Sequence, residues 1–222
     1  MTAGGRRGAV RWAAALALLL ALPGARWMLA AAGDHQGLPP ELRAVMLRAP
    51  ARLPSVTLVD QQGATLTSDA LFTGHWSFLF LGFASCPTVC PATLSQLAAV
   101  KRSLARQFPA TAQPRYVFVS VDPQRDPPAR LASYLAGFDA DFVGATGQPA
   151  ALASLSDALT AFHRLDAPSP SGDYGVVHSG EIYLLAPSGR VYARFTPPLD
   201  TNVIPRLLVS MMASYASERE RS

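Results

Sequence analysis

The run from Trp76 to Phe83 constrains the fold more than any other part of the chain. It is nearly all apolar and rich in aromatic side chains, which is typical of a central β-strand buried on both faces. From Pro91 the pattern becomes helical, because apolar residues recur at spacings of three and four. These residues are Leu94, Leu97, Val100 and Leu104. A buried strand followed by an amphipathic helix predicts a strand–helix unit at the centre of a domain.

Further β-rich and helical stretches alternate with this unit. Strands are expected at 56–59, 116–121, 142–143, 174–178, 181–185 and 191–195, with a tight turn at 179–180 between the fourth and the fifth. Helices are expected from 127 or 128, over 150–162 and over 202–215. Turns at 60–63 and 187–189 predict a β-hairpin near each end of the domain. The alternation favours an α/β fold with parallel central strands, made mixed by the hairpins and flanked by helices.

Positive charge is concentrated at the N-terminus. The net charge of +4 comes from arginines at 6, 7, 11 and 26, since acidic and basic residues balance from 33 onward. We therefore expect no nucleic-acid binding. The arginines and the apolar stretch at 12–22 indicate a signal sequence or an N-terminal membrane anchor, with the body on the outer side.

The domain organisation follows from these shifts in composition. We expect a leader at 1–32, a linker rich in Pro, Gly and charge at 33–52, a domain at 53–217 and a polar tail at 218–222. The leader is either a cleaved signal or a retained anchor, and the sequence leaves both open.

Cys86 and Cys90 are the only cysteines in the chain, and they lie between the apolar run and the helical pattern. If both lie in the first turns of a helix, the spacing of four puts their sulfurs on one face. A helix N-terminus stabilises a thiolate, the form that attacks a disulfide or binds a metal. The pair therefore predicts a thioredoxin-like redox pair or part of a site for a soft ion such as Cu(I). An inert disulfide is the remaining reading, although closing so short a loop adds little stability.

A soft-metal site needs a further ligand from elsewhere in the chain. His178 is the best candidate, because it ends a predicted strand and precedes a tight turn. The other histidines are less well placed: His35 lies in the linker, His75 precedes the central strand at its far end, and His163 follows a helix. Position alone does not decide, since a single histidine is more often a core or surface residue than a ligand.

Three segments occur in a characteristic order: Cys-Pro-Thr-Val-Cys-Pro at 86–91, Val-Ser-Val-Asp-Pro at 119–123, and Val-His-Ser-Gly-Glu-Ile-Tyr-Leu-Leu-Ala-Pro-Ser-Gly at 177–189. Together they resemble the Sco/SenC family of copper-binding thioredoxin-like proteins, over about 53 to 215. The resemblance implies a thioredoxin-like fold and a membrane-tethered domain outside the cytoplasm, in the bacterial periplasm. It also implies binding of Cu(I) and Cu(II), and a role in assembling the dinuclear copper centre of cytochrome c oxidase.

Carried onto this chain, the resemblance implies that copper is bound by Cys86, Cys90 and His178. Asp122 matches an acidic position of the family that would tune the metal or dock a partner, and the alternative is a turn-forming residue. Thr88 is a departure, because many members have an acidic residue inside the cysteine pair. This departure would weaken Cu(II) binding or change the choice of partner without removing a ligand.

Three functions remain open on this basis. The first is a copper metallochaperone, not an enzyme, that works with the copper-site subunit of the oxidase and with other copper chaperones. The second is a thiol–disulfide reductase that keeps that subunit's cysteines reduced through Cys86 and Cys90 without needing His178, and that depends on thioredoxin-like reductants. The third is a copper or redox sensor that acts by binding another protein. The chaperone is the function that we expect.

Overall fold

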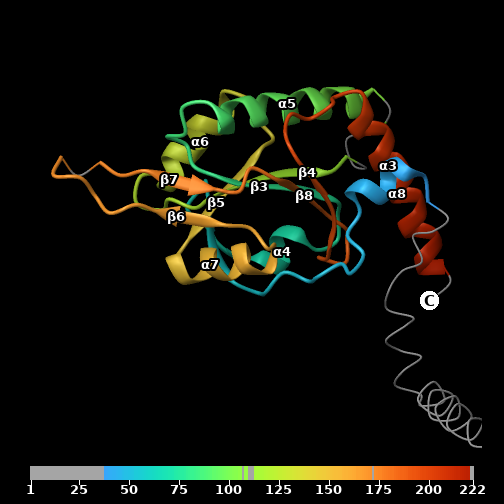
Figure 1. Cartoon of the computed structure of the whole chain (residues 1–222), viewed down its shortest axis with the longest axis horizontal. Coiled ribbons are helices and arrows are strands. Elements are labelled where there is room, and N and C mark those ends of the chain that lie inside the picture. The colour runs from blue at the N-terminus through green and yellow to red at the C-terminus, as the bar shows by residue number, and fades with distance from the viewer. Residues whose placement is uncertain (1–37, 107, 110–112, 172, 221–222) are drawn as a thin grey trace, which may run out of the picture. The chain divides into compact units, whose positions relative to one another are not determined.

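The computed structural model describes residues 38–106, 108–109, 113–171 and 173–220. Within these residues a seven-stranded sheet runs in the order β2-β1-β5-β4-β3-β8-β9 (Figure 1). The strands are β1 (Thr57–Asp60), β2 (Thr65–Thr67), β3 (Ser77–Gly82), β4 (Arg115–Ser120), β5 (Val143–Gly147), β8 (Ile182–Leu185) and β9 (Val191–Phe195). β3, β4 and β5 are parallel, whereas β1 and β8 join them antiparallel. This mixed sheet, with antiparallel pairs β1–β2 and β8–β9 at its ends, confirms the predicted fold class.

Helices cover both faces of the sheet (Figure 1). They are α3 (Pro40–Val45), α4 (Ser68–Phe72), α5 (Val89–Ala105), α6 (Pro128–Ala136), α7 (Pro149–Ala158) and α8 (Val203–Glu220). α5 and α6 lie over one face, and α4 and α7 lie over the other. α3 packs against α8 and β9 at one end of the sheet. Since β3 has helices above and below it, the sequence pattern of a strand buried on both faces is explained.

β3 is the centre of the core, and its six residues are all buried. Leu79 belongs to a core cluster that includes Leu155 of α7. On the alternate positions, the Phe80 ring contacts the Phe118 ring of β4 at a centroid distance of 5.8 Å. Full burial of large side chains on both faces makes this strand a rigid support for the loop that follows it.

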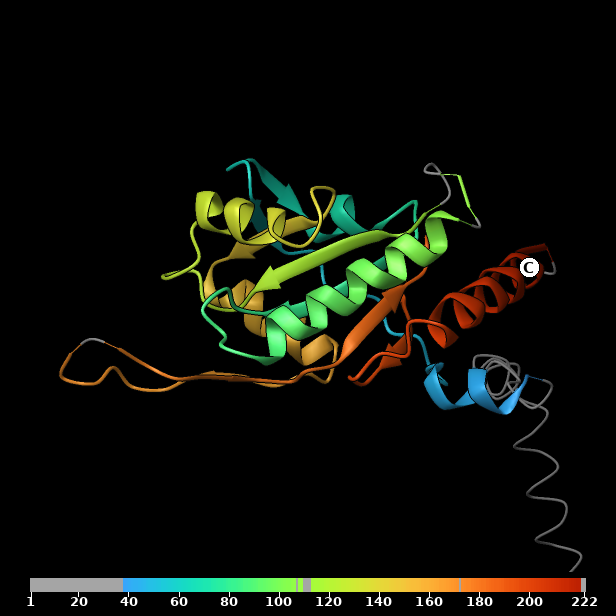
Figure 2. The ribbon, with the colours of Figure 1, turned by 90° about the horizontal axis from the view of Figure 1, so that it is seen from above.

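A second sheet consists of β6 (His163–Leu165) and β7 (Val176–His178), which pair antiparallel with His163 opposite His178. The hairpin that they form extends away from the main sheet, and Figure 2 shows it passing the first turn of α5. The sequence did not predict β6: the helix expected to reach Phe162 ends at Ala158, and Thr160 takes a left-handed conformation with φ of 52°. β7 pairs with β6, while β8 pairs with β3 and β9.

The compact unit begins at Pro39, earlier than the expected domain start at Leu53. Leu42 and Met46 are 2% and 6% exposed, and Met46 forms a β-bridge with Ala193 of β9. Residues 39–52 of the predicted linker thus pack with the compact unit, through the few apolar side chains that they carry. The predicted tail at 218–222 continues α8 to Glu220.

The predicted leader at 1–32 and His35 lie outside the described residues. In the part of the chain that the structure does describe, no helix has both the length and the apolar character needed to span a membrane.

Candidate metal centre

The two cysteines lie where β3 passes into α5. Cys90 is in the first turn of α5 and is 0% exposed, whereas Cys86 precedes the helix and is partly exposed. The expectation that both lie in the helix is thus correct only for Cys90. Thr88 is the N-cap residue but makes no side-chain cap. Instead the Cys86 sulfur accepts the N–H of Cys90 at 3.4 Å, so it satisfies one of the unpaired amide groups at the helix start.

His178 reaches the cysteines from the end of β7. Its Nε2 lies 3.4 Å from the Cys90 sulfur, and its Nδ1 donates a hydrogen bond to the Ser179 carbonyl at 2.8 Å. A proton fixed on Nδ1 leaves the lone pair of Nε2 directed at the sulfur, which is the tautomer that a metal ligand requires. The rings of Phe80 and Phe83 contact the imidazole edge-on and help to exclude water from it.

Cys86, Cys90 and His178 form a group whose ligand atoms all lie within 4.8 Å of one another. Two sulfurs and one imidazole nitrogen are soft or borderline donors, a set that suits Cu(I). A structural zinc site uses four protein ligands, and this group supplies three. The donor set therefore fits copper better than zinc.

The electrostatics of the three groups differ. Burial raises the pKa of Cys86, but the N–H groups of Cys90, Thr88 and Val89 outweigh it, so that the pKa falls below the usual thiol value. Burial raises the pKa of Cys90 far above that value. Burial also lowers the pKa of His178, which keeps its imidazole neutral near pH 7. The site thus has one readily ionised thiol at its entrance and one protected thiol beneath it.

The remaining predicted candidates lie outside this group. His75 binds the Leu71 carbonyl through Nε2 at 2.9 Å, and His163 is held by the Ser156 hydroxyl at 2.7 Å. Asp122 is fully buried and does not belong to the three-residue cluster found in the described part of the chain. Its predicted role in tuning the metal or docking a partner stays a prediction.

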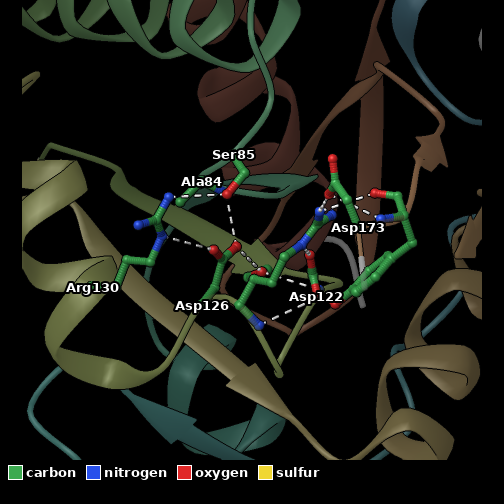
Figure 3. A network of polar contacts seen from close by, with 9 residues as sticks. Ala84, Ser85, Asp122, Asp126, Arg130 and Asp173 are labelled. Carbon is green, nitrogen blue, oxygen red and sulfur yellow. Dashed lines mark hydrogen bonds and ion pairs between the residues drawn. The ribbon is translucent and has the colours of Figure 1, made fainter. Parts of the chain in front are cut away.

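A polar network beside the site was missed by the sequence analysis (Figure 3). The Asp122 carboxylate accepts hydrogen bonds from Arg125 Nε at 2.5 Å and from the Tyr174 hydroxyl at 2.6 Å. Asp126 accepts the N–H of Ala84 at 2.7 Å. The sequence did contain a signal for this network. Two acidic residues four apart directly follow a buried strand, where burying a carboxylate without partners costs free energy, so that partners are expected.

Comparison with known proteins identifies the family of this chain. The SCO1/SenC family model matches residues 48–213. A Stutzerimonas stutzeri protein, named for copper binding, is 34% identical over 181 residues, which are 81% of this chain and 86% of that protein. The mitochondrial SCO2 homolog of Bos taurus is 31% identical over 166 residues, or 75% of this chain and 62% of its own, so this chain spans less than two thirds of that relative.

Solved structures give the same result for the fold. The crystal structure of yeast Sco1 with copper bound has a TM-score of 0.69 and 27% identity, covering 78% of this chain and 96% of that one. The family model covers well over half of the chain, and the thioredoxin-like fold predicted from the sequence is shared with this relative. By sequence and by fold, this chain belongs to the SCO1/SenC family.

Proposed function

We propose that the protein binds one copper ion through Cys86, Cys90 and His178 and delivers it to the copper centre of cytochrome c oxidase during assembly. The observation that carries the proposal is the convergence of three soft donor atoms within 4.8 Å. Membership of the SCO1/SenC family and the copper bound in the related yeast Sco1 support it.

Cys86, Cys90 and His178 would have different roles in the transfer of copper. Cys90 is buried and His178 is held by a hydrogen bond to Ser179 and by two aromatic rings, so these two form the fixed part of the site. Cys86 is partly exposed. A partner protein can therefore approach the ion from the Cys86 side and exchange ligands there, as delivery of copper as cargo requires.

A second function is favoured by the asymmetry of the two thiols. A Cys86 thiolate can attack a disulfide of the oxidase subunit, forming a mixed disulfide and releasing one subunit thiolate. The Cys90 sulfur then attacks Cys86, which forms the Cys86–Cys90 disulfide and releases the second subunit thiol. The subunit gains two electrons in this exchange. A thioredoxin-like reductant must then supply two electrons to reduce the Cys86–Cys90 disulfide again. A partly exposed thiol of lowered pKa beside a buried one suits this sequence of steps.

The compartment and the partners follow from the same proposal. The protein would act on the outer side of the inner membrane, in the periplasm, held there by its leader at 1–32. Its partners would be the copper-site subunit of the oxidase, the copper chaperone that loads it and the reductant that keeps Cys86 and Cys90 reduced.

Complementation of a deletion strain separates the two functions. For delivery of copper, we expect Cys86→Ser, Cys90→Ser and His178→Ala all to lower oxidase activity and added copper to restore part of it. His163→Ala is the matched control, because His163 lies opposite His178 in the same hairpin, and we expect it to support normal activity. Normal oxidase activity with His178→Ala, together with rescue of the cysteine variants by an added thiol reductant, would contradict the chaperone and favour the reductase.

A further inference from the structure

The metal centre is built from two chain segments that belong to different sheets. The cysteines follow β3 of the large sheet, whereas His178 ends β7 of the small one. The loop 121–127 after β4 contacts both segments (Figure 3). The position of His178 relative to Cys90 therefore depends on how this loop holds each side.

One end of the loop holds the segment 84–90, which carries the two cysteines and is called the cysteine segment below. Asp126 is fully buried and accepts the N–H of Ala84 at 2.7 Å. Its carboxylate lies 3.4 Å from Arg130 Nε, and the Arg130 guanidinium also donates to the Ser85 hydroxyl at 3.0 Å. Since Ser85 directly precedes Cys86, this end of the loop fixes the start of the cysteine pair.

The other part of the loop holds the hairpin, through Arg125. Its Nε donates to Asp122 at 2.5 Å, and one terminal nitrogen donates to the Tyr174 carbonyl at 3.0 Å and to Asp173 at 3.3 Å. The guanidinium carbon lies 3.9 Å from the centroid of the Tyr174 ring. The Tyr174 hydroxyl in turn donates to Asp122 at 2.6 Å, so that the three side chains close a ring of contacts.

This arrangement depends on the shape of arginine as well as on its charge. Asp122 is 0% exposed, and a buried carboxylate needs a charged partner. The planar guanidinium donates in several directions while it stacks on an aromatic face, which the compact ammonium of lysine cannot do. Tyr174 lies on the same arm of the hairpin as His178, so a clamp on Tyr174 restrains the histidine.

We propose that Arg125 is a positioning residue for the metal centre. Its clamp on Asp122 and Tyr174 holds the β6–β7 hairpin where the His178 imidazole meets the Cys90 sulfur. Arg125 acts through His178 and not on the copper ion itself. The proposal deepens the copper-binding function above and rests on it.

A double-mutant cycle on the full chain tests this coupling. Competition titration with a chromophoric Cu(I) chelator gives the affinity of wild type, Arg125→Lys, His178→Ala and the double variant. We expect Arg125→Lys to weaken Cu(I) binding about tenfold, as is usual for groups that orient a metal ligand. In the His178→Ala background the same change should have no further effect. An equal loss in both backgrounds would overturn the proposal.

Arg164→Lys is the matched control. Arg164 lies on the same hairpin and pairs with Asp166 at 3.2 Å, but its side chain is 62% exposed. We expect wild-type affinity from this variant, because exposed ion pairs restrain little. A tenfold loss from Arg164→Lys as well would mean that any arginine-to-lysine change near the metal centre weakens copper binding, and the clamp would be refuted.

Hydrogen exchange of the metal-free chain tests the clamp without copper. In Arg125→Lys, the amides of β7 should exchange faster while those of the cysteine segment stay unchanged. Tyr174→Phe is a milder variant, since it removes only the hydroxyl bond to Asp122 and leaves the Arg125 pair intact, and it should give a smaller change of the same kind. Unchanged exchange in β7 for both variants would overturn the proposal. Absence of copper binding by wild type would instead refute the proposed function.

Discussion

A single methyl group at Gly82, the last residue of β3, probes the packing under the metal centre. A Cβ at this position would lie 2.6 Å from Phe118 Cε2 and 2.9 Å from the Cys90 sulfur, whereas ordinary contact begins at 3.4 Å. Phe118 and Cys90 are 1% and 0% exposed, so neither can swing into solvent. Gly82→Ala must therefore displace the ring, the strand or the sulfur.

The cost of this displacement can be bounded. Overpacking a dense core destabilises a protein by about 1–3 kcal/mol. We expect Gly82→Ala to reach the upper half of this range, because both colliding groups are buried and the Phe118 ring is packed between the Phe80 and Tyr134 rings. Since the Cys90 sulfur is 3.4 Å from His178 Nε2, a displaced sulfur should also weaken Cu(I) binding.

Two measurements check this prediction. Denaturant unfolding of the copper-free chain gives the free energy of unfolding, and chelator competition gives the Cu(I) affinity. Gly180→Ala is the matched control, because it lies just beyond His178 and an added Cβ there meets nothing within 4 Å. Wild-type stability and affinity for Gly82→Ala would refute the packing argument.

Three further predictions follow from the same contacts. Iodoacetamide should label Cys86 well before Cys90, because neighbouring N–H groups lower the pKa of Cys86 while burial raises that of Cys90; peptide mass spectrometry after a short pulse checks this, and equal labelling would contradict it. Burial holds the pKa of His178 below its ordinary 6.5, so the stability that it adds is complete above about pH 6.5 and is lost as pH falls toward the folded pKa; unfolding free energies near pH 7.5 and pH 5 should differ less in His178→Ala than in wild type, and an equal difference would count against it. Asp126→Ala should cost about 1–3 kcal/mol in thermal or denaturant unfolding, because the partly buried Ala84 N–H and the buried Ser120 hydroxyl lose their acceptor; a change no larger than that of the exposed-pair variant Asp166→Ala would show that these bonds contribute little.

Structure is predicted best from the sequence where neighbouring residues determine it. The apolar run around β3 needs no distant information. The spacing of Cys86 and Cys90 correctly indicated a pair at a helix start, although only Cys90 lies inside the helix. The small strand β6 is the opposite case. Its three residues carry no apolar alternation, and they become a strand only because β7 pairs with them.

The third ligand and the buried carboxylates depend on contacts between distant segments. His178 lies 88 residues from Cys90, so spacing could not place it. Its position at the end of a predicted strand made it the best candidate, and the family resemblance implied that it is a ligand. The sequence left Asp122 open between an acidic position of the family and a turn residue, because aspartate side chains are mostly exposed. It is buried because Tyr174, 52 residues away, supplies a hydroxyl, and Arg125 supplies a charge.

The central claim is that three residues bind one copper ion. Cu(I) titration of the reduced full chain, compared with Cys86→Ser, Cys90→Ser and His178→Ala, tests it most directly, and His163→Ala serves as the neighbouring control. We predict binding of one equivalent that is strongly weakened in the three variants and unchanged in the control. Equal effects of His178→Ala and His163→Ala, or no stoichiometric binding by wild type, would contradict the claim.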